Sequence, residues 1–288
     1  MRCDDCGLVA THPVPAPEDI PGFYGGEYYG EQNQKFGRLT ETFITLFRFA
    51  RRRALRLAGV RHGGTLLDVG CGRGRFLSIA ARAGYVVYGT ELTEESARAA
   101  RHTVGEDRVR VGTLARCGFA PGRFDAVTMW HVFEHLPDPG ETLDECHRLL
   151  RPGGTLVLSV PNIESWQARW AGGSWFHLDM PRHLVHYSPE TLTAMLARHG
   201  FRIEALSHFS LEQNPFGLLQ SGLHRIGRPH FGLYRLLRGP LDRRHRSRAR
   251  RLPGYLAYLA AFPVAAVVCY VGSILRSGAT FTAIARRV

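Results

Sequence analysis

The nonapeptide LLDVGCGRG at residues 66–74 decides the fold, because an apolar run passes through three glycines into a helical pattern. Thr65–Val69 has the composition of a buried strand, and Arg75–Ala83 has helical spacing and is followed by Gly84. Glycines between a strand and a helix allow a tight turn and a close approach of the backbone to a ligand, and the helix start offers unpaired N–H groups. The stretch therefore predicts a ligand-binding strand–loop–helix unit.

Strand and helix patterns alternate along the chain after this unit. We expect further strands at 85–90, 108–111, 124–130, 155–160, 201–207 and 279–288, and helices at 39–59, 94–102, 139–150 and 188–199. Regular alternation implies a parallel, doubly wound α/β sheet with right-handed crossovers, whose ligands bind at the carboxyl ends of the strands. The predicted parts are an N-terminal cap at 1–38, a core at 39–207, an insertion at 208–278 and a final core strand at 279–288.

The spacing of glycines and acids distinguishes between adenosine cofactors. A dinucleotide site favours a further glycine at position 75, where this sequence has Arg75. Glu91 follows the second predicted strand, 21 residues after Gly70, and a carboxylate there can accept hydrogen bonds from both ribose hydroxyls. The pattern argues against NAD and favours another adenosine cofactor.

Four motifs occur in order over residues 65–162, namely LLDVGCGRGRFL, VVYGTEL, FDAVTMWHVFEHLPDP and RLLRPGGTLVLSVPN. They resemble the motifs of class I S-adenosylmethionine (SAM)-dependent methyltransferases, each on the element where that family carries it. The resemblance implies a Rossmann-like sheet of seven strands, in which the seventh lies antiparallel between the fifth and the sixth. It also implies SAM as the cofactor.

The resemblance further implies a role for each matching residue of the cofactor site. The loop glycines would line the methionine part of SAM, Asp68 would orient the loop or contact the amino group, Glu91 would hold the ribose, and Leu92 would pack on the adenine. Thr113 and Leu114 stand where the family often has an acidic residue, so recognition of adenine there would rest on the backbone. The predicted cofactor site comprises Asp68, Gly70, Cys71, Gly72, Gly74, Glu91, Leu92, Thr113, Leu114, His131 and Val132.

Histidines are the candidates for a catalytic base, because an imidazole changes charge near neutral pH. The segment WFHLDMPRHLVHYSP at 175–189, which we call the signature loop, resembles the substrate-side wall of methyltransferases similar to the ubiquinone-biosynthesis O-methyltransferases. An alternative is that its polar side chains only hold the loop together through hydrogen bonds. The predicted catalytic residues are His131, His183 and His186, and the predicted substrate contacts are Tyr24, Tyr28, Trp175, Asp179 and Arg182.

The pair Cys3 and Cys6 is similar to one knuckle of a zinc ribbon that precedes some methyltransferases of this subfamily. A structural zinc ion needs four ligands, and a second CxxC pair does not occur in the sequence. We therefore expect no metal site, unless Cys3 and Cys6 belong to a ribbon that other ligands complete.

The segment 252–275 contains 24 residues and no charge, which is long enough to cross a bilayer. The preceding run, 238–251, carries seven arginines against the single acid Asp242, a pattern typical of attachment to anionic lipid. A single crossing would leave the final strand on the far side of the membrane, which conflicts with the fold. Interfacial attachment is favoured, and the alternatives are a hairpin broken near Pro263 and a helical lid that covers the domain or a second subunit.

These observations predict a SAM-dependent methyltransferase that acts on a small or lipid-linked acceptor, with O-methylation favoured. Scattered cysteines and an N-terminus without an apolar leader predict a cytoplasmic enzyme, held at the inner face of the cell membrane through 238–275. The net charge of +12 leaves an RNA methyltransferase as an alternative, but arginines beside an apolar segment, rather than among stacking aromatics, disfavour a nucleic-acid partner. A non-catalytic SAM-binding protein and a homodimer are further alternatives.

Overall fold

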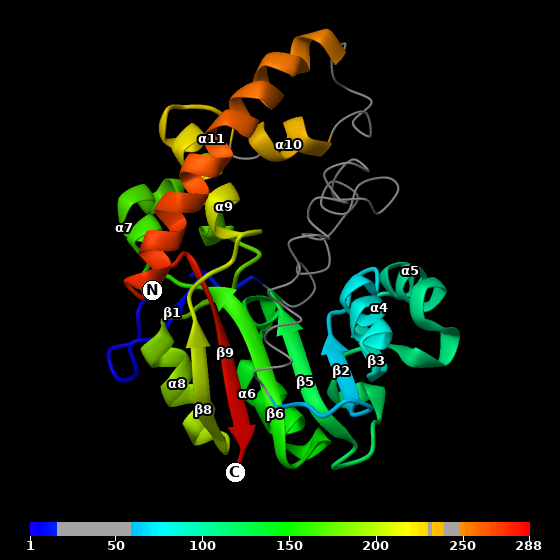
Figure 1. Cartoon of the computed structure of the whole chain (residues 1–288). Coiled ribbons are helices and arrows are strands. Elements are labelled where there is room, and N and C mark those ends of the chain that lie inside the picture. Colours follow the sequence, from blue (N-terminus) through cyan, green and yellow to red (C-terminus); the bar gives the residue numbers. More distant parts are fainter. Residues whose placement is uncertain (16–58, 230–231, 239–247) are drawn as a thin grey trace. The chain divides into compact units, whose positions relative to one another are not determined.

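The computed structural model describes residues 1–15, 59–229, 232–238 and 248–288 of the chain (Figure 1). Most of the predicted cap and of the predicted helix at 39–59 lies outside these residues. The chain divides into two compact units, which are treated separately below. Unit 1 draws on Met1–Arg48, Pro161–His186 and His208–Phe281, and unit 2 on Phe49–Val160, Tyr187–Ser207 and Thr282–Val288.

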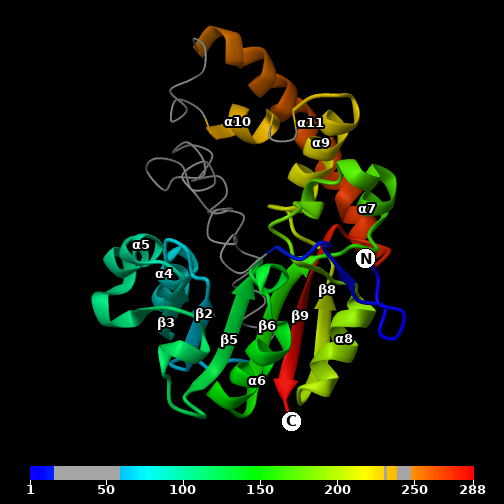
Figure 2. The same ribbon diagram turned by 180° about the vertical axis from the view of Figure 1, so that it is seen from behind.

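Unit 2 is built around a sheet of seven strands. These are β2 (Thr65–Val69), β3 (Val86–Glu91), β4 (Val109–Val111), β5 (Phe124–Trp130), β6 (Leu150–Pro161), β8 (Phe201–Ser207) and β9 (Thr280–Arg287). Their order is β4-β3-β2-β5-β6-β9-β8. The pairs β2–β3, β2–β5, β3–β4 and β5–β6 are parallel, whereas β8–β9 is antiparallel. The predicted mostly parallel sheet with its last strand between the fifth and sixth is confirmed, and Figures 1 and 2 show it from both sides.

Four helices of unit 2 begin and end where local signals place them. They are α4 (Arg75–Arg82), α5 (Glu94–Val104), α6 (Pro139–Leu149) and α8 (Pro189–Arg198). The Thr93 hydroxyl caps α5, and the Asp138 carboxylate caps α6 by accepting the Glu141 N–H at 2.8 Å. Ser188 forms a reciprocal capping box with Thr191 at the start of α8.

The core of unit 2 joins α4 and α5 to the sheet. Each large side chain in it is almost completely removed from water, and burial of one such side chain contributes about 1.5–3 kcal/mol. The cluster that connects these elements contains Leu66, Phe76, Leu77, Val87, Ala97, Ala100, Val109, Ala126 and Val157. This packing holds the loop after β2 at the carboxyl edge of the sheet.

The described residues of unit 1 form a small sheet and four α-helices. β1 (Val9–Ala10) pairs antiparallel with β7 (Val185–His186), so the N-terminal residues are tied to the signature loop. The helices are α7 (Trp166–Ala171), α9 (Asn214–Arg225), α10 (Gly232–Arg238) and α11 (Arg248–Ile274). α9 packs against the other three helices. Among the described residues of unit 1, α9 is thus the helix that connects the other three.

A buried polar cluster anchors α9 in unit 1. Asn214 is completely buried; its Nδ2 donates to the His208 carbonyl at 3.1 Å, and its Oδ1 accepts from Thr280 at 2.8 Å. Its main-chain carbonyl accepts from Nε2 of Gln167, which is also completely buried, at 3.1 Å. Because buried polar groups stay stable only when they are paired, this cluster fixes one position for the start of α9.

Three details differ from the sequence-based expectation. β6 begins at Leu150 rather than at position 155, because Leu150 pairs with Phe124 across an irregularity in the β5–β6 ladder. The six residues of α7 were not predicted, since so short a helix has little periodicity. A hairpin near Pro263 is excluded, because α11 continues through both Pro253 and Pro263. The packing of α9 along α11 supports the helix despite the hydrogen bonds that the prolines remove.

We expect the substitution Ser188→Ala to lower the free energy of unfolding by about 1 kcal/mol, because the backbone N–H of Thr191 loses its buried capping partner. The midpoint of urea unfolding, followed by circular dichroism, measures this loss. Thr193→Ala in the same helix is the control: its hydroxyl is exposed and contacts only the Pro189 carbonyl, so its midpoint stays within error of the wild type. Equal midpoints for both variants would contradict the capping role.

Candidate cofactor and acceptor sites

The glycine loop after β2 combines a close contact with an open hollow. At Gly70 (φ 65°) an added Cβ would lie 2.7 Å from Cγ2 of Val132, so only glycine fits beside that side chain. At Gly72 (φ 57°) an added Cβ would meet no atom within 4 Å among the described residues. The backbone at Gly72 is thus open to a ligand, while Gly70 is packed from behind. Gly74 completes the loop as the N-cap of α4.

Two buried carboxylates flank this loop in unit 2. Asp68 is 3% exposed and accepts a hydrogen bond from the Thr128 hydroxyl at 2.6 Å, which fixes the orientation of the carboxylate. Glu91, at the end of β3, is 8% exposed and accepts the backbone N–H of Gly72. The loop after β2 is thereby tied to the end of the neighbouring strand. Both acids lie where the spacing predicted them.

The remaining predicted cofactor residues of unit 2 differ in exposure. Leu92 is 62% exposed directly after Glu91, whereas Leu114 is buried and Thr113 is exposed beyond the end of β4. An exposed leucine beside a buried acid offers an apolar surface for a flat ring. Burial, together with the charges of nearby Asp68 and Glu91, raises the pKa of the Cys71 thiol above its ordinary value. Cys71 therefore stays protonated and packs as an apolar side chain.

His131 lies beside the buried Glu134 carboxylate just beyond the end of β5. Nδ1 of His131 lies 3.4 Å from Oε1 of Glu134, and the two side chains are 19% and 1% exposed. His131 adopts φ 57°, a left-handed conformation that non-glycine residues seldom take, and its N–H donates to the Ser159 carbonyl at 2.9 Å. A histidine held by a buried carboxylate can accept a proton and remain oriented.

Tyr187 is a buried aromatic residue near Glu134. Its ring is completely buried and stacks on Phe133 with 5.1 Å between centroids. Burial, with a smaller effect of the Glu134 charge, raises the pKa of the Tyr187 hydroxyl well above its ordinary value, so it remains neutral. Two residues of this region were not predicted from the sequence. They are Glu134, three residues after His131, and Thr128, a hydroxyl inside an apolar strand.

The acceptor-side residues of the signature loop are tightly held within unit 1. Asp179 forms a bidentate ion pair with Arg182, and its Oδ2 lies 3.8 Å from Nε2 of His183. Nδ1 of His183 donates to the His177 carbonyl at 2.8 Å, which places the basic lone pair on Nε2, beside Asp179. His183 thus has a defined tautomer that is suited to proton transfer.

His186 and Trp175 occupy more enclosed positions. His186 is 3% exposed, and its Nε2 lies 3.2 Å from the hydroxyl of Thr11, which itself donates to the His183 carbonyl at 2.6 Å. Trp175 is 1% exposed and packs in a small cluster with Ala168 and Ala171. These contacts favour a structural role for His186 and Trp175 over the predicted catalytic and substrate-binding roles. The predicted contacts Tyr24 and Tyr28 lie outside the described residues.

The Cys3–Cys6 pair forms a tight turn at the protein surface. The Cys3 N–H donates to the Leu8 carbonyl at 2.8 Å, and the Gly7 N–H donates to the Cys3 carbonyl at 3.0 Å. Hydrogen bonds from the backbones of Cys6 and Asp5 lower the pKa of the Cys3 thiol. The turn presents two sulfur ligands, half of what a structural zinc ion requires.

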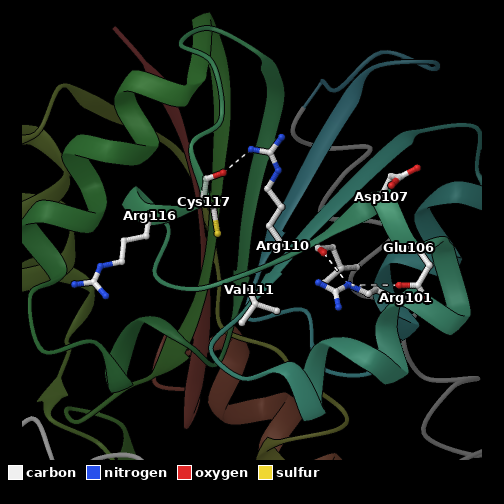
Figure 3. Close-up of a pocket in the computed structure, with 8 residues that line it drawn as sticks. Arg101, Glu106, Asp107, Arg110, Val111, Arg116 and Cys117 are labelled. Carbon is white, nitrogen blue, oxygen red and sulfur yellow. Dashed lines mark hydrogen bonds and ion pairs between the residues drawn. The ribbon is translucent and has the colours of Figure 1, made fainter.

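A hollow of about 620 Å³ lies at the outer edge of unit 2, beside β4. Figure 3 shows Arg110 directed toward the Cys117 carbonyl and Arg101 toward Glu106, so both arginines already have partners. None of the predicted cofactor or acceptor residues lines it. Its lining comprises Arg101, Glu106, Asp107, Val109, Arg110, Val111, Arg116 and Cys117. The hollow is therefore separate from the glycine loop.

Known proteins resemble both the sequence and the fold. A ubiquinone biosynthesis O-methyltransferase of Xanthomonas euvesicatoria pv. vesicatoria (strain 85-10) is 34% identical over 164 residues, which cover 53% of this chain and 67% of that protein. One of Thiobacillus denitrificans (strain ATCC 25259 / T1) is 31% identical over 156 residues, 50% and 67% of the two chains. The match covers 65% of the length of a Xanthomonas campestris relative, so this chain matches about two thirds of the length of these proteins.

Two solved structures share the fold at low sequence identity. A SAM-dependent methyltransferase of Archaeoglobus fulgidus has a TM-score of 0.51 at 21% identity and covers 86% of this chain and 99% of its own. One of Mesorhizobium loti has a TM-score of 0.50 at 19% identity, with 83% and 98% covered. The methyltransferase-domain family matches residues 43–206, more than half of the chain, and includes the glycine loop and the signature loop. The chain therefore belongs to this family and is a SAM-dependent methyltransferase.

Proposed function

We propose that the enzyme transfers the methyl group of SAM to a hydroxyl oxygen of a small or lipid-linked acceptor. The observation that carries this proposal is the contact between His131 and the buried Glu134 carboxylate, which adjoins the glycine loop through Val132. A hydroxyl becomes a competent nucleophile when a positioned base takes its proton. We assign the role of base to His131, which Glu134 orients. Relatives at 31–34% identity carry the name of O-methyltransferases, which agrees with an oxygen acceptor.

The residues around the loop fit SAM. The open backbone at Gly72 would accommodate the methionine part, and the Glu91 carboxylate would accept hydrogen bonds from the ribose. The exposed Leu92 side chain would cover the adenine, and Asp68, fixed by Thr128, would face the amino group. Every residue in this assignment belongs to unit 2.

The reaction needs alignment and the removal of one proton. SAM supplies an electrophilic methyl group on a sulfonium ion, and the acceptor oxygen forms the new bond as the carbon–sulfur bond breaks. His131 takes the hydroxyl proton, and Glu134 stabilises the imidazolium that results. Within unit 1, the Asp179–Arg182 ion pair and the oriented His183 are proposed to contact the acceptor.

We also propose that the enzyme works at the cytoplasmic face of the cell membrane through 238–275. The described residues include one helix long and apolar enough to cross a bilayer, Leu252–Ile274, and only 17% of its most apolar window is buried. Such a location would bring the protein to a lipid-linked acceptor.

An acceptor screen with radiolabelled SAM tests the proposed chemistry. Membrane lipid extract, polar metabolite extract and total RNA are offered in parallel, and the labelled product is treated with reagents that cleave methyl ethers. We expect label in an ether-bound methyl group of a small or lipid-linked product. Label confined to RNA, or to nitrogen or carbon, would contradict the proposal.

The substitution Gly72→Arg should abolish SAM binding in isothermal titration calorimetry, because its side chain fills the hollow left open at this position. Gly153→Arg is the matched control. Gly153 also has a positive φ (69°), and an added Cβ would meet no atom within 4 Å among the described residues. Unlike Gly72, it lies near the start of β6 and outside the glycine loop. It should keep wild-type affinity. Equal loss in both variants would indicate backbone strain rather than a cofactor contact.

The substitution Glu91→Gln should weaken SAM binding by about 10- to 100-fold, since a hydrogen bond to a charged group contributes about 1.5–3 kcal/mol. Glu95→Gln removes an exposed carboxylate from the first turn of the adjacent α5 and serves as the control for charge. Calorimetry measures both dissociation constants. Unchanged affinity in Glu91→Gln would refute the ribose contact.

The substitution His131→Gln should lower the turnover number by about 100-fold on the acceptor that the screen identifies, because the proton loses its base. Glu134→Gln should lower it by about tenfold, which corresponds to about 1.4 kcal/mol of lost imidazolium stabilisation. SAM affinity should stay within about threefold in both variants, a change of less than about 0.7 kcal/mol. His102→Gln on the exposed side of α5 is the control. Parallel losses of turnover and of SAM affinity would point to a structural role.

A further inference from the structure

From Leu252 onward, one half of the α11 surface is exposed and carries no charge. Four of the exposed residues are small or are prolines: Pro253, Ala257, Ala260 and Pro263. At about 100° per residue, these four and the larger exposed residues together cover an arc of about 180° around the helix. The larger members are 43–72% exposed and define what we call the apolar face: Leu252, Leu256, Leu259, Val264, Val267, Val268, Tyr270, Val271, Ile274 and Leu275.

The opposite half of α11 is fully used by packing inside unit 1. The Tyr255 hydroxyl donates to the Leu236 carbonyl of α10 at 2.6 Å, and Sγ of Cys269 accepts from Gln167 at 3.1 Å. At Gly272 an added Cβ would lie 2.3 Å from the Trp166 ring, so that ring sits directly on the helix backbone. The rotation of α11 about its axis is therefore fixed, and the apolar face cannot turn inward.

We propose that the apolar face of α11 inserts into one leaflet of an anionic bilayer, with the helix axis in the plane of the membrane. The inference specifies the membrane partner of the proposed function and rests on it for the side of the membrane. Amphipathic helices bind in this way when an apolar face is joined to basic residues. Here seven arginines at 238–251 precede the face, and Arg276 follows it.

The width of the apolar face favours lipid over a second copy of the chain. A partner helix covers a narrow stripe, about two positions in every seven, and leaves the flanking positions in water. If two α11 helices paired in this way, about half of the uncharged 180° arc on each helix would remain in water. A bilayer covers the whole arc, and its anionic headgroups complement the arginines at either end.

The packing of α9 and α10 favours a helix that lies in the interface rather than one that crosses. Both helices pack along α11, so a crossing would carry them into the bilayer. The end of α9 and the residues directly after it expose Arg225 and Arg228, which the hydrocarbon core would disfavour. Arg225 lies over the half-exposed Trp170 ring at 5.1 Å. Arginine and tryptophan are typical of the membrane–water interface.

Sedimentation of the full-length protein with vesicles tests the proposal. The vesicles contain phosphatidylglycerol and phosphatidylcholine, and pure phosphatidylcholine is the comparison. We expect the wild type to sediment with the anionic vesicles, and L259E/V267E/I274E to lose at least about tenfold in partitioning because three charges enter the apolar face. The control A81E/A120E/T193E adds the same charge at exposed positions of unit 2 and should sediment like the wild type. Nitroxide labels at L256C, V267C and I274C, each in a C3S/C6S background, should report equal depths.

Each outcome either supports or overturns insertion of the apolar face into a leaflet. A wild type that ignores anionic vesicles overturns the proposal, as does a wild-type dimer that the apolar-face variant converts to monomers without any vesicle binding. A middle label much deeper than the outer two overturns the in-plane orientation in favour of a crossing helix. Calorimetry with SAM accompanies every variant: unchanged affinity shows an intact fold, and it separates failure of membrane docking from failure of the methyltransferase assignment.

Discussion

The backbone N–H of Gly72 donates to the carboxylate of Glu91, and this hydrogen bond joins the ends of two neighbouring strands. It can form because β2 and β3 are parallel and in register, from Thr65 opposite Val86 to Val69 opposite Thr90. Parallel pairing brings both carboxyl ends to one edge, and crossover helices then must cover the faces of the sheet. The strand order, the buried core beneath α4 and α5, and the position of the cofactor site all follow from this arrangement.

The opposite side of the same loop is set by the end of β5. Val132 packs against Gly70 so closely that no side chain would fit there, and the adjacent His131 takes a strained backbone conformation. Strain of this kind persists only where the surroundings enforce it, here through the Ser159 carbonyl and the buried Glu134 carboxylate. The glycine loop, which we propose binds the cofactor, and the candidate base are therefore held together.

Local sequence patterns predicted most strands and helices of the sheet domain, but they did not predict individual side-chain contacts. β5 and β8 have the predicted bounds, because each is an apolar run with clear stops on both sides. The Glu134 pairing was not foreseen, since an acid inside a motif gives no sign of its burial. Continuity of α11 through Pro263 was also not foreseen, because proline signals a break and only the packing of α9 reverses that preference. The tautomer of His183 likewise depends on a carbonyl six residues away.

α9 contacts two parts of unit 1 that would otherwise be unrelated. The Ser221 hydroxyl accepts the Phe176 N–H of the signature loop at 2.9 Å, and Gly217 leaves room for the His177 ring, whereas the other side of α9 packs on α11. The signature loop, which we propose contacts the acceptor, and the proposed lipid face thus both pack on α9. If α11 lies in a leaflet, the enzyme samples acceptors by lateral diffusion, and its rate depends on their mole fraction in the lipid instead of their bulk concentration. Dilution with inert lipid would then slow turnover at constant total acceptor.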